Sequence, residues 1–254
     1  MIYITGDTHN IEDMSNLSSR NMKLCCLEQG IDFHNITNAI VLGDFGLPWS
    51  SDCEIDESGI HSYDHTDRYL LKWYNQKPFK VLAVMGNHDN YDVIEKLPEV
   101  DMFGNKVLKV SDNVFYLKRG EIYTIEDKRF FVLGGAMSDD KVWREPHESW
   151  WEQEEWSEGE KIACLEKIVQ CGGNFDYVLS HTGPSAGITL TDDFFCNEEN
   201  LKQLYHDSTV VFNDKIDSII SYKKWFFGHW HSDWGYDNSK ESKYVPLYHQ
   251  GIVI

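Results

Sequence analysis

The segment Ile2-Tyr3-Ile4-Thr5 is a short run of β-branched and aromatic residues that leads directly into the polar segment Gly6-Asp7-Thr8-His9. An apolar run of this length predicts a strand that is buried on both faces. Similar runs recur along the chain at residues 39–42, 81–84, 177–180 and 225–227. We therefore expect several buried strands, each followed closely by polar residues.

Helical patterns alternate with these runs, at residues 22–29, 68–75, 161–169 and 200–205. Strands that alternate with helices predict an α/β fold whose sheets are covered by helices. Residues 114–117, 122–125 and 129–133 are expected to form antiparallel strands with a tight turn at 126–128, and residues 252–254 a last strand. Because no internal repeat or Pro/Gly-rich linker divides the chain, we expect a single domain over residues 1–254.

The composition narrows the class of partner. Lysine and arginine total 23 against 42 aspartates and glutamates in 254 residues, and this net charge of −19 disfavours nucleic acid as a partner. No apolar run approaches the ~18 residues of a membrane-spanning helix, so no membrane contact is expected. The six cysteines form no C-x-x-C pair. Together with the lack of a secretory signal pattern, this indicates reduced thiols and a cytoplasmic location.

Two stretches interrupt the alternation and are candidate insertions that cap a cleft. Residues 48–67 are polar and acidic. An EF-hand counted from Asp52 has Glu57 where glycine is required, so a solvated loop is expected instead. Residues 142–160 carry four tryptophans among glutamates. This second stretch either covers a substrate cleft or is a surface loop that its tryptophans anchor to the core.

Five polar segments follow the predicted strands. They are Gly6-Asp7-Thr8-His9, Gly43-Asp44, Gly86-Asn87-His88-Asp89, Ser180-His181-Thr182 and Gly228-His229-Trp230-His231. Ligands of open α/β sheets bind beyond the carboxyl ends of the strands. We therefore expect these loops to meet at one point, although they are far apart in sequence. A glycine before a polar side chain lets the backbone approach a bound group closely.

The residue types in these segments indicate a metal site. Aspartate and histidine supply oxygen and nitrogen ligands that suit manganese, iron or zinc, and no cysteine takes part. Asp44 can bridge two cations through its two oxygens, and Asn87 adds an amide oxygen. Two divalent cations would outweigh the charges of the carboxylates and attract an anionic phosphate. We therefore expect two divalent metal ions, with manganese preferred and iron or zinc as alternatives.

In this order, the five segments resemble the calcineurin-like metallophosphoesterase superfamily, whose motifs are D-x-H, G-D, G-N-H-[DE], H and G-H-x-H. The likeness runs from Asp7 to His231. It implies a four-layer α/β/β/α sandwich of the metallo-dependent phosphatase type. It also implies that one metal is held by Asp7, His9, Asp44 and His231, and the other by Asp44, Asn87, His181 and His229.

The activity that this resemblance implies is hydrolysis of a phosphomonoester or phosphodiester, in a small molecule or a nucleotide. A metal-bridging hydroxide would attack the phosphorus in line with the leaving oxygen. Asp44 and His88 are the expected catalytic residues, and Asn87 and His88 are expected to contact the substrate. Two other functions remain open, a catalytically silent metal- or nucleotide-binding module and a nuclease.

Three further features bear on the substrate. Protein phosphatases of this superfamily read G-D-x-x-D-R-G, but here Leu47 replaces the second aspartate, so His88 lacks the carboxylate that would orient it. Arg144 is a candidate to bind substrate through its guanidinium, or else forms a surface ion pair. The segments at 134–138 (Gly-Gly-Ala-Met-Ser) and 149–155 (Ser-Trp-Trp-x-x-Glu-Glu) resemble a bacterial and phage-associated subgroup.

Overall fold

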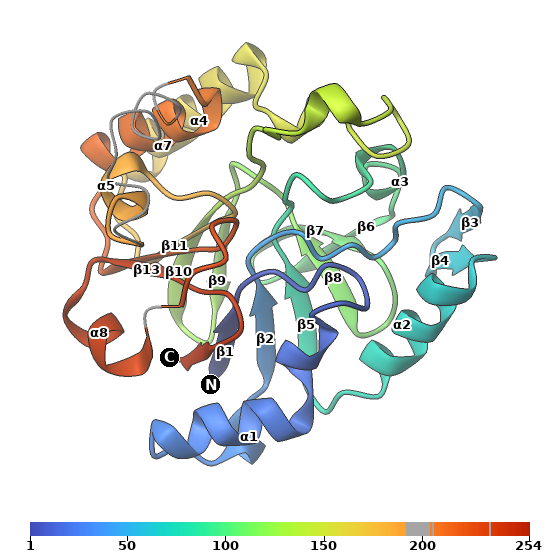
Figure 1. Cartoon of the computed structure of the whole chain (residues 1–254). Coiled ribbons are helices and arrows are strands. Elements are labelled where there is room, and N and C mark those ends of the chain that lie inside the picture. The colour runs from blue at the N-terminus through green and yellow to red at the C-terminus, as the bar shows by residue number, and fades with distance from the viewer. Residues whose placement is uncertain (192–203, 205, 234) are drawn as a thin grey trace.

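The structure is a computed structural model that describes residues 1–191, 204, 206–233 and 235–254. Two β-sheets lie face to face at its centre, with helices on the outside (Figure 1). The larger sheet has the strand order β14 (Gly251–Val253), β1 (Ile2–Thr5), β2 (Asn38–Val41), β5 (Lys80–Ala83), β8 (Val114–Leu117), β7 (Asn105–Lys109) and β6 (Glu99–Met102). The smaller sheet has the order β13 (Tyr244–Pro246), β12 (Lys224–Phe227), β11 (Tyr177–Ser180), β10 (Lys128–Leu133) and β9 (Ile122–Ile125).

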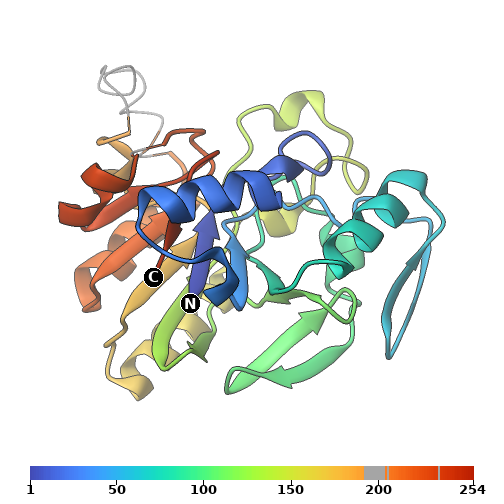
Figure 2. The same ribbon diagram turned by 90° about the horizontal axis from the view of Figure 1, so that it is seen from below.

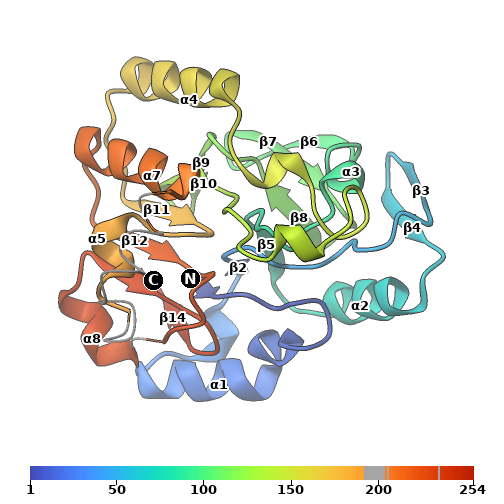
Figure 3. The ribbon, with the colours of Figure 1, turned by 45° about the horizontal axis from the view of Figure 1, so that its top comes forward.

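Helices cover the outer face of each sheet. Figure 3 shows α1 and α2 along one side of the molecule and α4 and α7 along the opposite side. The α-helices within the described residues are α1 (Ser19–Glu28), α2 (His65–Asn75), α3 (Tyr91–Ile94), α4 (Glu158–Cys171), α5 (Ser185–Ile188), α7 (Ser208–Ile219) and α8 (Gly235–Glu241). Among the described residues, none of these helices combines the length and the apolar character needed to cross a bilayer.

Three buried apolar clusters separate the four layers. On β1, Ile2 and Ile4 pack into the cluster between the two sheets, together with Phe130 and Val132 of β10. Tyr3, which points to the opposite face of β1, packs instead with residues of α1 and α2. The third cluster joins the outer face of the smaller sheet to α4 and α7. The predicted α/β/β/α sandwich is therefore confirmed, and the period-two alternation of strand side chains explains it.

The predicted buried strands are present, but one pairing is wrong. The antiparallel hairpin of β9 and β10 forms with Glu126 and Asp127 at its turn, and both turn residues have positive φ. The strand at 114–117, however, lies in the other sheet, parallel to β5 and antiparallel to β7. An apolar run that is buried on both faces fits either sheet equally well, so local pattern does not select its partner.

The structure also contains elements that periodicity does not indicate. Residues 48–67, expected to be a solvated loop, include the hairpin of β3 (Cys53–Asp56) and β4 (Gly59–Ser62). The polar hairpin of β6 and β7 and the helix α7 were not predicted either. The predicted helices at 22–29, 68–75 and 161–169 begin about three residues too late, because polar caps precede the apolar pattern. The helix predicted at 200–205 lies outside the described residues, except for residue 204.

The parallel strands bring the polar loops to one edge of each sheet. β1, β2 and β5 are parallel neighbours in the larger sheet, as are β10, β11 and β12 in the smaller one. Their carboxyl ends therefore lie at a common edge. The two ends of the chain lie side by side (Figure 2), and Ile2 donates its backbone N–H to the carbonyl of Ile254 at 3.0 Å.

Candidate metal centre

Two groups of acidic and imidazole side chains meet beyond the carboxyl ends of these strands. Each group has ligand atoms that all lie within 4.8 Å of one another. The loops after β1, β2, β11 and β12 supply their members. One group consists of Asp7, His9 and His231, and the other of Asp44, His181 and His229. Both sheets thus contribute to the same site.

Asp44 lies between the two groups. Its Oδ1 is 3.1 Å from Nε2 of His181, and its Oδ2 is 3.4 Å from Nε2 of His9. Asn87 joins the second group, because its Oδ1 is 2.9 Å from the same Nε2 of His181. One carboxylate therefore faces both groups with a different oxygen. This is the arrangement that a bridging ligand requires.

The backbone adopts uncommon conformations at these positions. His9, Asp44, His229 and His231 have φ values of 40°, 47°, 67° and 46°. Residues other than glycine seldom occupy this region, and the strain is held where a site requires it. At Gly228 a Cβ would lie 2.2 Å from Oδ1 of Asp7, so glycine is needed for the close approach of this loop.

Burial and charge in the site suit cations. The side chains of Asp7 and Asp44 are 0% and 2% exposed, and buried carboxylates require positive partners. Burial opposes protonation of His181, but the charge and hydrogen bond of Asp44 raise its pKa to about 10. Burial and the neighbouring His181 lower the pKa of His229 to about 3, which keeps its imidazole neutral. A neutral imidazole beside buried carboxylates fits a divalent metal ion.

Contacts to the other ring nitrogen orient two of the imidazoles. Nδ1 of His9 is 2.9 Å from Oδ2 of Asp13, and Nδ1 of His181 is 2.7 Å from the carbonyl of Leu42. Each contact leaves Nε2 directed at Asp44. Metal-ligating histidines in general have such a partner on the other ring nitrogen. Asp13 was not among the predicted site residues, although its spacing of four residues from His9 is a usable signal.

A model of the calcineurin-like phosphoesterase family matches residues 1–233. The chain belongs to this family. No curated protein matches the chain. The structure places all seven predicted ligands close together, six of them in the two groups and Asn87 beside His181. Their individual roles as ligands stay predictions, as does the narrower subgroup.

His88 lies beside the two groups and contacts Arg144. Its backbone N–H donates to Oδ1 of Asp44 at 2.7 Å. Its Nε2 is 2.5 Å from Nη2 of Arg144, so a guanidinium faces the imidazole that lacks the aspartate replaced by Leu47. Burial lowers the pKa of His88, and the positive charge of Arg144 acts in the same direction, against the opposing charge of Asp44.

Arg144 contacts His88 and also forms an ion pair with an exposed aspartate. Its side chain is 8% exposed, and its Nη2 is 2.8 Å from Oδ1 of Asp140. Its Nη1 donates to the carbonyl of Ser149 at 3.3 Å. The stretch at 142–160 thus brings a buried guanidinium to His88. Two further residues near the site, Ser138 and Glu154, were not among the predicted site residues.

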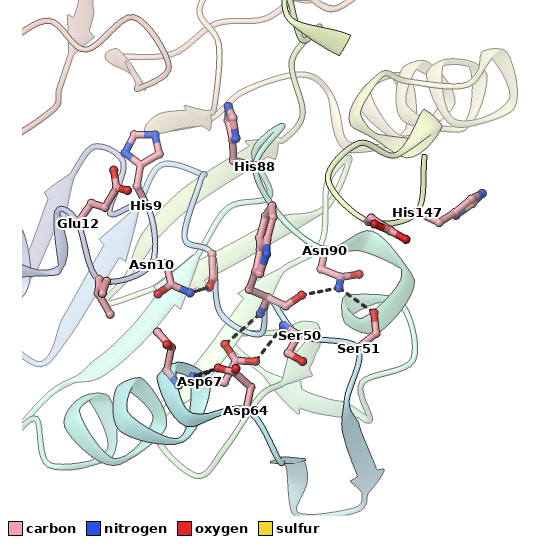
Figure 4. Close-up of a pocket in the computed structure, with 15 residues that line it drawn as sticks. His9, Asn10, Glu12, Ser50, Ser51, Asp64, Asp67, His88, Asn90 and His147 are labelled. Carbon is pink, nitrogen blue, oxygen red and sulfur yellow. Dashed lines mark hydrogen bonds between the residues drawn. The ribbon is translucent and has the colours of Figure 1, made fainter. Parts of the chain in front are cut away.

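A cavity of about 870 Å³ adjoins His9 and His88 (Figure 4). These two imidazoles lie at one side of the pocket, and His147 lies at the other. Both candidate capping insertions contribute to the lining, the first through Trp49, Ser50 and Ser51 among others, the second through His147 and Glu148. His147, which belongs to none of the five polar segments, has its Nδ1 2.9 Å from Oδ2 of Asp92.

Proposed function

We propose that this protein is a dinuclear-metal phosphoesterase that hydrolyses a phosphomonoester or phosphodiester of a small molecule or nucleotide. The observation that supports it best is Asp44, which faces both ligand groups with different oxygens. Manganese is the preferred metal, with iron or zinc as alternatives. When bound, two such cations supply positive charge to the phosphoryl oxygens and an activated water for in-line displacement.

The protein's own residues bind and orient the phosphoryl group. Asn87 and His88 are adjacent in the loop after β5, and the Arg144 guanidinium lies 2.5 Å from the His88 ring. A phosphoryl oxygen placed here would meet an imidazole and a guanidinium together. We assign to His88 the hydrogen bond to the leaving oxygen and to Arg144 the stabilisation of the charge that develops.

The adjoining cavity supports a single phosphate on a small organic group. Its volume of about 870 Å³ lies in the range of small-molecule sites. Its lining residues, all of which the structure describes, include Glu12, Asp64, Asp67 and Glu148 but neither lysine nor arginine. This environment favours an uncharged or cationic leaving group and disfavours a second phosphate.

The nuclease alternative has less support. A net charge of −19 repels the nucleic acid backbone, and we do not propose nucleic acid or membrane partners. Cys25, Cys26, Cys53, Cys164 and Cys171 are free thiols, which supports our proposal of a cytoplasmic location.

The test is hydrolysis of p-nitrophenyl phosphate and bis-p-nitrophenyl phosphate by the metal-free protein with added Mn²⁺. We expect turnover that depends on Mn²⁺, and the ratio of the two rates separates monoesterase from diesterase. Asp44→Asn is the matched variant, and it should lose both metals by elemental analysis together with turnover. Two bound metals without hydrolysis of either ester would favour the silent binding module. Cleavage of DNA alone would favour the nuclease.

A further inference from the structure

The side-chain amide of Asn87 can only serve a metal if its oxygen points toward the site. An amide has an acceptor end and a donor end of almost equal size, so shape alone does not select the orientation. Asn87 is 3% exposed. Its Oδ1 lies 2.9 Å from Nε2 of His181, and its Nδ2 donates to Oγ of Ser138 at 3.0 Å. The contact with Ser138 therefore favours the orientation in which Oδ1 faces the ligands.

Glu154 determines the direction of the hydrogen bonds that the Ser138 hydroxyl makes. The Ser138 hydroxyl donates to Oε2 of Glu154, and these two side chains are 2% and 1% exposed. An ionised carboxylate only accepts hydrogen bonds, so it takes the single hydrogen of the hydroxyl. The lone pairs of Ser138 are then left for Nδ2 of Asn87. In this way a buried carboxylate fixes the direction of two successive hydrogen bonds.

The other oxygen of the Glu154 carboxylate also has partners. Oε1 of Glu154 accepts the backbone N–H of Trp151 at 3.1 Å and is 3.9 Å from Nη1 of Arg144. The two segments that carry Ser138 and Glu154 also approach closely. At Gly135, which has a φ of 81°, a Cβ would lie 2.2 Å from the carbonyl oxygen of Glu154. Glycine is therefore required where these segments meet.

We propose that Ser138 and Glu154 are positioning residues that keep Oδ1 of Asn87 turned toward the ligand group of Asp44, His181 and His229. They act through Asn87 and do not touch the substrate. The segments at 134–138 and 149–155, which have no part in the proposed phosphoester hydrolysis, thereby gain a positioning role. The inference rests on the proposed function, because its readout is the binding of the cation that Asn87 would help to hold.

The test compares Glu154→Gln and Ser138→Ala with the wild-type chain by titration of the metal-free proteins with Mn²⁺ alone. Glutamine has nearly the same shape but can donate to Ser138, and alanine removes the hydroxyl. Loss of such an outer contact in general weakens metal binding about 10- to 100-fold. We expect this loss in one of two binding steps, with the other step unchanged. Burial raises the pKa of Glu154 to about 7, so the titration is done at pH 8, where the carboxylate is ionised.

Glu152→Gln is the matched control, because this neighbouring glutamate is exposed and loses the same charge. It should bind Mn²⁺ as the wild type does. Thermal melting in the presence of a chelator shows whether each variant folds. If Glu154→Gln does not fold, Mn²⁺ binding by Ser138→Ala is the test. Wild-type affinity in both steps for a folded Ser138→Ala overturns the inference. If the wild-type chain itself binds no Mn²⁺, the proposed function fails instead.

Discussion

His9, Asp44, His229 and His231 all have positive φ, and all four face the candidate metal centre. Strain at one residue is tolerated when surrounding contacts hold it in place. For His9, these contacts include Asp13 on one ring nitrogen and Asp44 on the other. At the scale of single residues, strained backbone conformations thus direct the ligand atoms at one point. The consequences are testable at His88 and at Gly228.

His88→Ala should lower kcat by roughly 10²–10³, since one contact to the developing charge is lost. Metal content should survive, because the predicted ligands do not include this side chain. Both quantities are measured on one preparation, by ester hydrolysis and elemental analysis. His34→Ala is the control, since the His34 side chain is 78% exposed and pairs with Asp32, which is not a predicted site residue. Turnover near the wild-type level would remove His88 from the mechanism.

Gly228→Ala should weaken metal binding much more than folding. The added Cβ would lie 2.2 Å from Oδ1 of Asp7, so the carboxylate must move away from His231 and His9. Mn²⁺ titration and thermal melting together measure the two effects. Gly159→Ala provides the comparison, because a Cβ there meets nothing within 4 Å and alanine favours the helix α4. Equal metal binding by Gly228→Ala and the wild type would contradict this prediction, because it would show that the loop accommodates the added Cβ.

At the scale of elements, polar caps determine where the helices begin. Ser157 and Glu160 form a capping box at α4, and the Asp64 side chain accepts two backbone N–H groups at α2. Asp207 caps α7 in the same way, through Thr209 and Val210. This last cap is unusual, because its carboxyl is buried close to other acidic side chains.

Asp207→Asn should stabilise the fold at pH 8. Burial raises the pKa of Asp207 from 3.8 to about 6, with a further contribution from Glu155 and Asp139. Because the pKa of Asp207 is higher in the folded state, its protonation stabilises the fold fully below pH 3.8. This stabilisation is lost as the pH rises through 6. Asparagine keeps the cap without the charge, so we expect a gain on the order of 2 kcal/mol at pH 8. The gain, measured by denaturant unfolding, should shrink as the pH falls below 6; a constant difference would exclude this cause.

At the scale of the whole molecule, the candidate metal centre joins the two sheets. Asp7, Asp44 and Asn87 follow strands of the larger sheet, whereas His181 and His229 follow strands of the smaller one. Apolar packing between the sheets fills the space beneath this edge. Cations bound here would hold loops of both sheets together and would favour the folded state over the unfolded one.

Mn²⁺ should therefore raise the melting temperature of the metal-free chain in a concentration-dependent manner. A ligand that binds only the folded state stabilises it by about 2.7 kcal/mol at 100 times its Kd. Differential scanning fluorimetry with added Mn²⁺ or a chelator measures the shift. In Asp44→Asn the shift should disappear. An Mn²⁺-independent melting temperature in the wild type would contradict a structural link between the sheets.

Much of the site was predictable because its signals are local. Each ligand segment pairs a short apolar run with a polar residue directly after it, and this pattern survives any arrangement of the strands. The partners of these ligands were not predictable in the same way. Ser138 contacts Asn87, and Glu154, 16 residues further along the chain, reaches Asn87 only through Ser138. Only Asp13, four residues from His9, carried a local signal.

The sequence by itself determined the α/β class, the strands that end in ligands and the ligand types, because these depend on residue order and short-range periodicity. Tertiary structure alone decided that β8 lies in the larger sheet, that Arg144 faces His88 in place of a carboxylate, and that Glu154 is buried next to Ser138. Such contacts depend on packing between segments that are distant in sequence. Their energies come from burial and hydrogen-bond geometry, which no local pattern encodes.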